Sequence, residues 1–187
     1  METTAIMQAT TWSIDPMHSE IHFKIKHLLI STVTGSFKSF HGGVTAEEED
    51  FENAEIDFTI DVNSIHTGQE MRDTHLKSAE FFDTENHPQI KFQSESFKKT
   101  KGDHYRLSGN LTMRGVTKPV ILDAEFGGIA KDHSGNIKAG FEVTGIINRK
   151  EFGLTYNSFT ETGGLALGED IKLSANIQLT EMAKGLV

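Results

Sequence analysis

Histidines are the side chains in this sequence most able to do chemistry, but their spacing favours no common metal site. The chain has nine His residues. His18 and His22 are four residues apart, and on a strand this spacing separates them by about 13 Å, too far to bind one ion. The sequence has no Cys, which excludes thiolate zinc sites, iron–sulfur clusters, disulfides and thiol nucleophiles. We therefore expect no metal site.

Motifs for nucleophilic catalysis and for phosphate binding are also absent from the sequence. Many serine hydrolases carry a G-x-S-x-G turn, and this chain has none. Gly163-Gly164-x-x-x-Gly168 lacks the Lys and Ser/Thr that follow the last Gly of a P-loop, so it predicts an ordinary loop. The scattered Ser, His and Asp residues do not by themselves predict an active site.

The composition is typical of a single folded domain. A chain of 187 residues is long enough for a sizeable core and too short to assume two domains. A net charge of −9 opposes binding to nucleic-acid phosphates or to an anionic bilayer, unless a local basic patch overrides it. The first residues lack the basic and apolar segments of a secretory signal, and no apolar run approaches the roughly 18 residues of a membrane helix. We expect a cytoplasmic protein that binds no nucleic acid.

Alternation of apolar and polar residues is the dominant pattern, and it places one set of side chains on each face of a strand. It is clearest at 54–62, where Ala, Ile, Phe, Ile and Val interleave with Glu, Asp, Thr and Asp. Because each segment has a polar face, the pattern favours antiparallel pairing. It predicts eight strands, near 21–26, 33–38, 54–62, 90–92, 105–113, 120–126, 141–147 and 171–179. Gly42-Gly43 is typical of a turn between two of them.

One helix is predicted between the third and fourth of these strands. Thr67-x-x-Glu70 has the pattern of a capping box, and Pro88 prevents continuation far beyond the end. We expect this helix to run from Thr67 to about Phe82. A shorter helical turn is expected at 148–153. The apolar face of the longer helix would carry Met71, His75, Ala79 and Phe82.

Eight amphipathic strands must shield their apolar faces from water and pair the backbone groups at their edges. Closure into a barrel hides both, although a sandwich of two sheets would show the same alternation. A barrel of about eight strands is wide enough either to fill with side chains or to hold a small elongated ligand. The alternation alone decides neither question.

Short motifs spread along the chain together resemble the YceI-like family, whose members resemble lipocalins in fold and bind polyisoprenoid or related lipids. The resemblance extends from Trp12 to Leu179. It suggests one domain at 12–180, with terminal extensions at 1–11 and 181–187. The motifs are Ile14-Asp15 with His18-Ser19, Phe23-x-Ile25-Lys26-His27-Leu28, Val33-x-Gly35-x-Phe37, Ser64-Ile65, Arg72-Asp73-x-His75-Leu76-Lys77, Phe81-Phe82-Asp83, Pro88-x-Ile90-x-Phe92, Gly109-x-Leu111-Thr112-x-x-Gly115-Val116-Thr117-Lys118-Pro119-Val120, Ile147-Asn148-Arg149 and Phe152-Gly153.

The resemblance implies an all-β fold, a closed eight-stranded antiparallel lipocalin-like barrel with one substantial helix packed across it. It implies an apolar tunnel that holds a long-chain isoprenoid lipid, either a polyisoprenoid, a polyprenyl phosphate or an isoprenoid quinone, which the protein sequesters or carries. It also implies a homodimer, no catalytic activity, and no cofactor apart from a bound isoprenoid lipid or quinone. Lipid exchange would involve transient membrane contact. Two alternatives stay open: a fatty-acid or fatty-amide binding protein, and a redox accessory enzyme acting on a bound quinone.

The tunnel lining is expected at inward positions of the predicted strands and on the helical segments. For each such residue, ordinary core packing is the alternative interpretation. Met71 and Met113 are favoured because a flexible thioether adapts to an irregular chain. The expected lining is Phe23, Ile25, Phe37, Ile56, Phe58, Met71, Phe82, Phe92, Leu107, Leu111, Met113, Phe141, Ile147 and Phe152.

A phosphate or quinone head group would need hydrogen-bond donors at the tunnel mouth. Each candidate also has a structural interpretation. Arg72 could pair with Asp73, Arg149 could tie down a loop, and His75 could be a hydrogen-bonded core histidine. The motif segments suggest Arg72, His75, Lys77, Arg149 and Asn157 as head-group residues.

Overall fold

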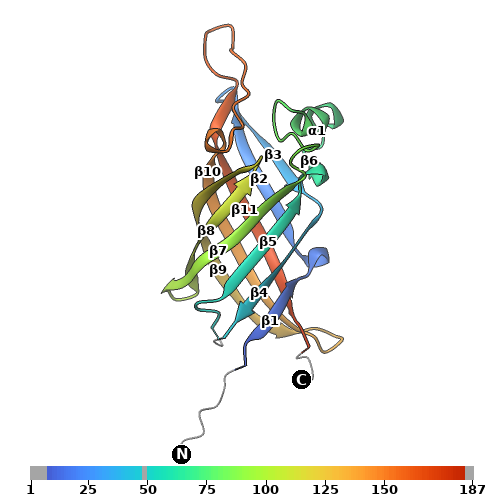
Figure 1. Ribbon diagram of the computed structural model, residues 1–187, viewed down its shortest axis with the longest axis vertical. Helices are drawn as coiled ribbons and strands as arrows, with labels where there is room; N and C mark the ends of the chain where they lie inside the picture. The colour runs from blue at the N-terminus through green and yellow to red at the C-terminus, as the bar shows by residue number, and fades with distance from the viewer. Residues whose placement is uncertain (1–7, 48–49, 184–187) are drawn as a thin grey trace, which may run out of the picture.

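Antiparallel strands form nearly all of the regular structure in the computed structural model, which describes residues 8–47 and 50–183 (Figure 1). Short 3₁₀ turns interrupt the strands at η1 (Pro16–His18), η2 (Val62–Ser64) and η3 (Arg149–Phe152), and α1 spans Glu70–Lys77. None of the described helices is long and apolar enough to cross a membrane. The strands are β1 (Thr10–Ile14), β2 (Glu20–His27), β3 (Ser31–Phe37), β4 (Phe40–Ala46), β5 (Glu55–Asp61), β6 (Ile65–His66), β7 (Gln89–Lys101), β8 (His104–Met113), β9 (Val116–Lys131), β10 (Ile137–Asn148) and β11 (Leu167–Glu181).

The sheet closes on itself. Its order is β1-β4-β5-β7-β8-β9-β10-β11, and β11 pairs back to β1. β2 continues along β11 beyond η1, β3 pairs with β2, and β6 pairs with β3. Three long strands of the barrel are therefore each interrupted once. They are β1 with β2, β3 with β4, and β5 with β6. Counted in this way, the wall is the closed eight-stranded antiparallel barrel that the family resemblance implied, and a two-sheet sandwich is excluded.

The strands that alternation predicted all form, but β1, β4 and β6 were not predicted. Gly42 and Gly43, expected in a turn, lie inside β4 and pair with Phe58 and Asp57 of β5. Glycine is needed at position 42 because an added Cβ would lie 2.5 Å from the carbonyl oxygen of Asp57. The prediction of a turn at Gly42-Gly43 was therefore wrong, because these glycines allow a close approach of two strands.

α1 is shorter than the predicted helix of 67–82. Gln69 occupies the N-cap without a side-chain hydrogen bond, so the predicted capping box does not form. Thr67 instead donates its hydroxyl and its backbone N–H to Asp73 Oδ1, at 2.5 and 2.9 Å. At the other end Ser78 is extended and its hydroxyl donates to the carbonyl of His75. α1 lies beside β6 at one end of the barrel (Figure 1).

The short turn at 148–153 forms as predicted. Asn148 caps η3 by accepting a hydrogen bond from the Lys150 N–H at 3.0 Å, and Gly153 ends it at a φ of 77°. Near the chain termini, β1 begins at Thr10 and β11 ends at Glu181, so both strands reach into the expected extensions. Residues 1–7 and 184–187 lie outside the described residues.

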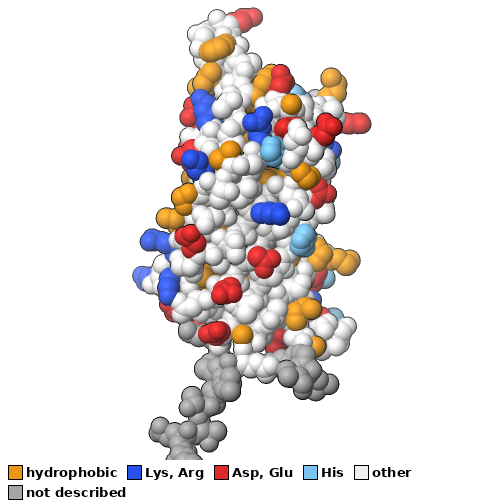
Figure 2. Space-filling view, viewed as in Figure 1, with side chains coloured by type: hydrophobic (Ala, Val, Ile, Leu, Met, Phe, Trp, Pro, Cys, Tyr) orange, Lys and Arg blue, Asp and Glu red, His pale blue; other side chains and the backbone are white. Residues whose placement is uncertain are grey.

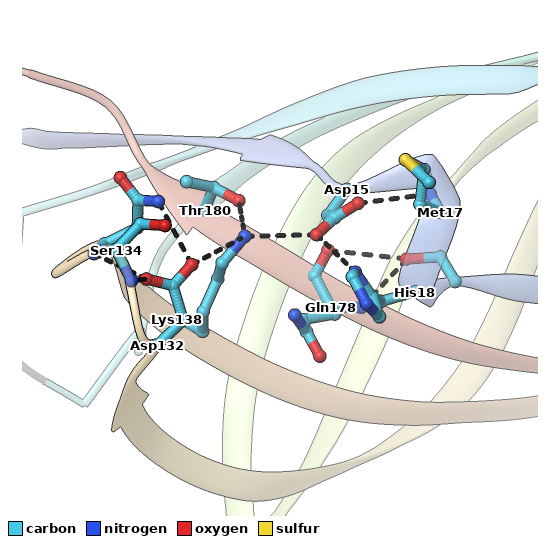
Figure 3. A network of polar contacts seen from close by, with 10 residues as sticks. Asp15, Met17, His18, Asp132, Ser134, Lys138, Gln178 and Thr180 are labelled. Carbon is cyan, nitrogen blue, oxygen red and sulfur yellow. Dashed lines mark hydrogen bonds and ion pairs between the residues drawn. The ribbon is translucent and has the colours of Figure 1, made fainter.

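A polar network fixes the junction between β1 and β2 (Figure 3). Asp15 accepts hydrogen bonds from His18 Nδ1 at 2.8 Å and from Lys138 Nζ at 3.0 Å. Lys138 also donates to the hydroxyl of Thr180 at 2.7 Å and approaches Asp132 at 3.9 Å. Burial alone would raise the pKa of Asp15, but the hydrogen bonds from His18 and Lys138 outweigh it and lower the pKa to about 2. The network ties η1 to β10 and β11.

Candidate functional site

The barrel encloses a cavity of about 620 Å³, a volume that suits a small elongated ligand. Its wall is made almost entirely of inward-facing apolar side chains, because inward and outward residues alternate along every strand. Phe92 on β7 and Leu111 on β8, for example, are cross-strand partners that both face this space. The barrel is therefore hollow in its middle rather than filled by its own side chains.

One end of the cavity is closed by aromatic rings. Phe51, in the loop between β4 and β5, is buried, and its ring centroid lies 5.2 Å from that of Trp12 and 5.6 Å from that of Phe126. Phe97 and Tyr105 stack nearby at 4.5 Å, and Tyr105 donates its hydroxyl to the carbonyl of Asp50. These contacts hold the loop across the barrel, so the cavity is blind at this end.

Apart from Thr144 on β10, Arg149 on η3 and Ser174 on β11, the polar residues of the lining gather at the opposite end. They come from three segments: the end of β2, the stretch from β6 through α1, and the loop after η3. Figure 1 shows α1 and this loop at the same end of the barrel. We call this end the mouth. Its polar residues are His27, Thr67, Gln69, Arg72, His75, Tyr156 and Ser158.

Arg72 is held in place at the mouth by Thr67. Its Nε donates to the Thr67 hydroxyl at 2.7 Å and its Nη2 to the Thr67 carbonyl at 2.8 Å. Thr67 in turn donates to Asp73, so the guanidinium and the carboxylate are linked through one threonine. Arg72 is half-buried and lines the cavity, which places a fixed positive charge beside an apolar space.

His75 joins α1 to the loop after η3. Its ring packs edge-on against Phe81 at 4.9 Å and against Tyr156 at 5.0 Å. Its Nε2 lies 2.5 Å from a carboxylate oxygen of Glu80. A fixed imidazole, a fixed guanidinium and the neighbouring hydroxyl groups give the mouth the donors that a polar head group would need.

The whole barrel matches one protein family. A family model described as the YceI-like domain matches residues 12–179. The chain belongs to the YceI-like family. A UPF0312 protein of Staphylococcus aureus strain USA300 is 38% identical over 172 residues, covering 91% of this chain and 98% of the relative. The resemblance read from the sequence motifs is thus confirmed.

Solved structures show the same architecture as this YceI-like chain. The YceI protein of Campylobacter jejuni is 34% identical, with a TM-score of 0.72 over 86% of this chain and 91% of that one. Burkholderia cenocepacia BcnA has a TM-score of 0.75 at 21% identity, covering 88% and 98% of the two chains. A polyisoprenoid binding domain from Saccharophagus degradans has a TM-score of 0.64 at 16% identity, covering 91% and 98%. At the last two identities the likeness shows the fold.

Most of the expected lining residues of the YceI-like chain do face the cavity, and two do not. The prediction for Met71 was wrong. The cavity is bordered by the N-cap residue Gln69 and by Arg72, His75 and Leu76 of α1, so Met71 points to solvent. The prediction for Phe152 was also wrong, because this last residue of η3 is fully buried and does not border the cavity. The residues that do line it are Phe23, Ile25, Phe37, Ile56, Phe58, Phe82, Phe92, Leu107, Leu111, Met113, Phe141 and Ile147.

The head-group candidates divide in the same way. Arg72 and His75 lie at the mouth, whereas Lys77 and Asn157 do not border the cavity. Asn157 instead binds the backbone of Leu167 with both ends of its amide, at 2.8 and 3.0 Å. Lys77 falls outside because it follows Leu76 by one residue, which rotates its side chain by about 100° around α1.

Arg149 borders the cavity, but its hydrogen bonds are structural. Its guanidinium is buried and donates to the carbonyls of Gly168, Leu154 and Tyr156, at 2.8, 2.5 and 2.8 Å. Burial lowers the pKa of Arg149, an effect that Glu169 opposes. The residue ties the loop after η3 to the start of β11, which was the structural alternative in the sequence.

Several mouth and end residues were missed by sequence reasoning. Thr67 and Gln69 were placed in a helix cap rather than at a site, and Tyr156 and Ser158 lie in a loop without periodic pattern. Phe51 follows a run of acidic residues and gave no signal at all. Ile90 and Val120 lie on predicted strands with an inward phase, so alternation could have found them. No group of three or more His, Asp or Glu within residues 8–47 and 50–183 is arranged to hold a metal ion.

Proposed function

We propose that this YceI-like protein binds a long-chain isoprenoid lipid inside the barrel and sequesters or carries it. The observation that carries the proposal is the apolar cavity of about 620 Å³ with one blind aromatic end and one polar mouth. Such a shape accepts an amphiphile tail first, with its head group at Arg72 and His75. The polyisoprenoid binding domain of Saccharophagus degradans, which has the same fold, supports this ligand class.

Hydrophobic driving force is ample for such a ligand. Burying about 20 methylene equivalents at about 0.8 kcal/mol each yields about 16 kcal/mol. That figure is already near the practical ceiling of about 18 kcal/mol for non-covalent binding. The competing solvent is a lipid bilayer, which is as apolar as the cavity, so transfer between them is nearly balanced. Selectivity must then come from the shape of the cavity and from the mouth.

The mouth favours an isoprenoid with an acceptor-bearing head group, a polyprenyl phosphate or an isoprenoid quinone. A guanidinium bound to Thr67 on one side is already oriented, so little conformational entropy is lost when it donates to a ligand oxygen. As part of the proposal, the protein acts in the cytoplasm as a homodimeric carrier without catalytic role or cofactor. The homodimer and the absence of catalysis are what the family resemblance implies.

Organic extraction of the purified protein, followed by mass spectrometry, tests the proposal. We expect one long-chain isoprenoid in a fixed molar ratio to the protein. Recovery of fatty acids or fatty amides would show that the protein is a fatty-acid or fatty-amide binding protein instead. Turnover of an added quinone would show a redox role instead of a carrier role. Protein that stays empty after expression and after incubation with isoprenoid lipids would contradict lipid binding altogether.

A further inference from the structure

Large apolar side chains stand exposed around the mouth. Leu29 and Ile30, in the turn between β2 and β3, are 79% and 84% exposed, Met71 on α1 is 82% exposed, and Phe159 in the loop after η3 is 80% exposed. We call these four side chains the rim. Figure 2 shows hydrophobic side chains at this end of the molecule, where the loop and α1 lie in Figure 1. An exposed apolar group of this kind marks an interaction surface.

The three rim segments are held together around the opening. The N–H of Leu28 donates to the carbonyl of Ala166 at 2.7 Å, which joins the β2–β3 turn to the loop after η3. The contact between His75 and Tyr156 joins the same loop to α1. The three rim segments are therefore joined to one another at the mouth through the loop after η3.

The β2–β3 turn is strained as well as exposed. Leu28 and Leu29 have φ values of 53° and 60°, and the Ile30 N–H closes the turn on the carbonyl of His27 at 3.2 Å. Positive φ at two central residues is the mark of a type I′ hairpin turn, which strongly favours Asn-Gly. Leucine is disfavoured there by sterics and by its exposure to water. Leucines at such a costly turn favour a functional role for their exposed side chains.

A small basic cluster lies on the outer wall just below the rim. Lys24 and Lys26 project from β2, and Lys172 is the cross-strand partner of Lys24 on β11. All three are exposed, and Asp170 lies two residues from Lys172. Like charges placed side by side are unfavourable alone and become favourable beside an anionic surface. Exposed Glu70 adjoins Met71 and exposed Glu161 follows Phe159 by two residues, so the attraction to an anionic surface rests on this cluster on the wall of β2 and β11. Salt screens charges beyond about 8 Å, which weakens the repulsion from acidic residues farther away.

We propose that the rim inserts into the surface of a lipid bilayer that contains anionic lipid, with the mouth opening toward the acyl chains. This inference rests on the proposed function, since the ligand would pass directly between two apolar phases. A bilayer fits better than a protein partner because the apolar side chains lie at an opening into an apolar cavity, and because the basic cluster complements anionic head groups.

Vesicle co-sedimentation tests this docking, with vesicles of phosphatidylcholine alone and of equimolar phosphatidylcholine and phosphatidylglycerol. The most informative variant is the double substitution Leu28→Asn and Leu29→Gly. It relieves the strained turn and removes two exposed leucines, so we expect a higher melting temperature together with at least tenfold weaker binding to the mixed vesicles. Opposite signs for stability and binding exclude misfolding as the explanation.

A matched pair of methionines provides the second test. Met71→Ser removes a rim side chain, whereas Met17→Ser removes a side chain that is 89% exposed on η1, at the opposite end of β2. We expect severalfold weaker vesicle binding for the first and no change for the second. Replacing Lys24 and Lys172 by Gln should remove the preference for phosphatidylglycerol and leave the weaker binding to phosphatidylcholine.

Three results would overturn the proposal: no binding of the wild type to either vesicle, equal effects of Met71→Ser and Met17→Ser, or a monomeric mass for the rim variants against a dimeric wild type. The last result would assign the rim to contact between two copies of the chain. Lipid loading is measured separately by extraction. A wild type that binds vesicles but never yields lipid would retain the docking surface and contradict the proposed function.

Discussion

The ring of Phe51, in the loop between β4 and β5, stands perpendicular to the ring of Phe141 on β10, with centroids 5.2 Å apart and an interplanar angle of 87°. Phe141 lies on the barrel wall, whereas Phe51 reaches it from a loop that crosses the barrel end. Both residues border the cavity. Phe51 is the loop residue among the rings that close this end of the cavity, so the chain length of a ligand should depend on it.

Phe51→Ala should lengthen the cavity. Loss of the ring removes contacts with Trp12, Phe126 and Phe141, so we expect a cost of about 3 kcal/mol in the free energy of unfolding. Mass spectrometry of extracted lipid should show a shift toward longer chains. Phe152→Ala is the matched control, because Phe152 is equally buried but does not border the cavity. It should lose similar stability with no shift, and an identical shift in both variants would contradict the assignment of Phe51 as the cavity floor.

Phe58→Glu and Leu111→Glu should each empty the cavity. A carboxylate in an apolar wall must either be desolvated or bring water into the space of the ligand, and both disfavour a lipid tail. We expect at least tenfold less extracted lipid per mole of folded protein. Thr59→Glu is the control for Phe58→Glu, since the next residue on β5 points to the other face of the sheet. Unchanged loading in a folded Phe58→Glu or Leu111→Glu variant would show that the lipid binds elsewhere.

The cavity wall could be predicted from sequence because a strand has a fixed side-chain period. Once Phe92 and Leu111 were assigned inward, their partners two residues away followed without knowledge of the fold. The floor and the mouth could not be predicted, because they depend on contacts between segments distant in sequence. Phe51 has a φ of 65° and packs on rings from three other elements, which no local pattern encodes. Met71 was misplaced for a related reason, since α1 turns by about 100° per residue and an error of one position moves a side chain to solvent.

Asp15 should give the fold a measurable loss of stability in acid. The pKa of Asp15 is lowered from 3.8 to about 2 in the folded protein, so the unfolded chain binds its proton more readily. The stabilisation is therefore present above about pH 4 and is lost as the pH falls toward 2, by up to about 2 kcal/mol. Urea unfolding across this range measures it.

Asp15→Asn provides the comparison for this pH dependence. The variant should be less stable than the wild type at neutral pH and should show a flatter profile between about pH 4 and 2. Asp123→Asn, at an exposed position on β9, should reproduce the wild-type profile. A wild-type profile that stays flat over this range would show that the hydrogen bonds from His18 and Lys138 contribute no net stability.

Arg149 should act as a structural residue rather than as a head-group ligand. Arg149→Ala removes the donor to the carbonyls of Gly168, Leu154 and Tyr156, so we expect a loss of about 3 kcal/mol in the free energy of unfolding. Arg149→Lys keeps the charge but cannot reach three carbonyls, and it should recover part of this loss at most. Arg72→Ala, at the half-buried mouth, should cost much less stability and should change the head groups of the extracted lipid. A stable Arg149→Lys variant that yields lipids with different head groups would contradict this assignment. It would show that Arg149 binds the head group and is not needed to hold the loop.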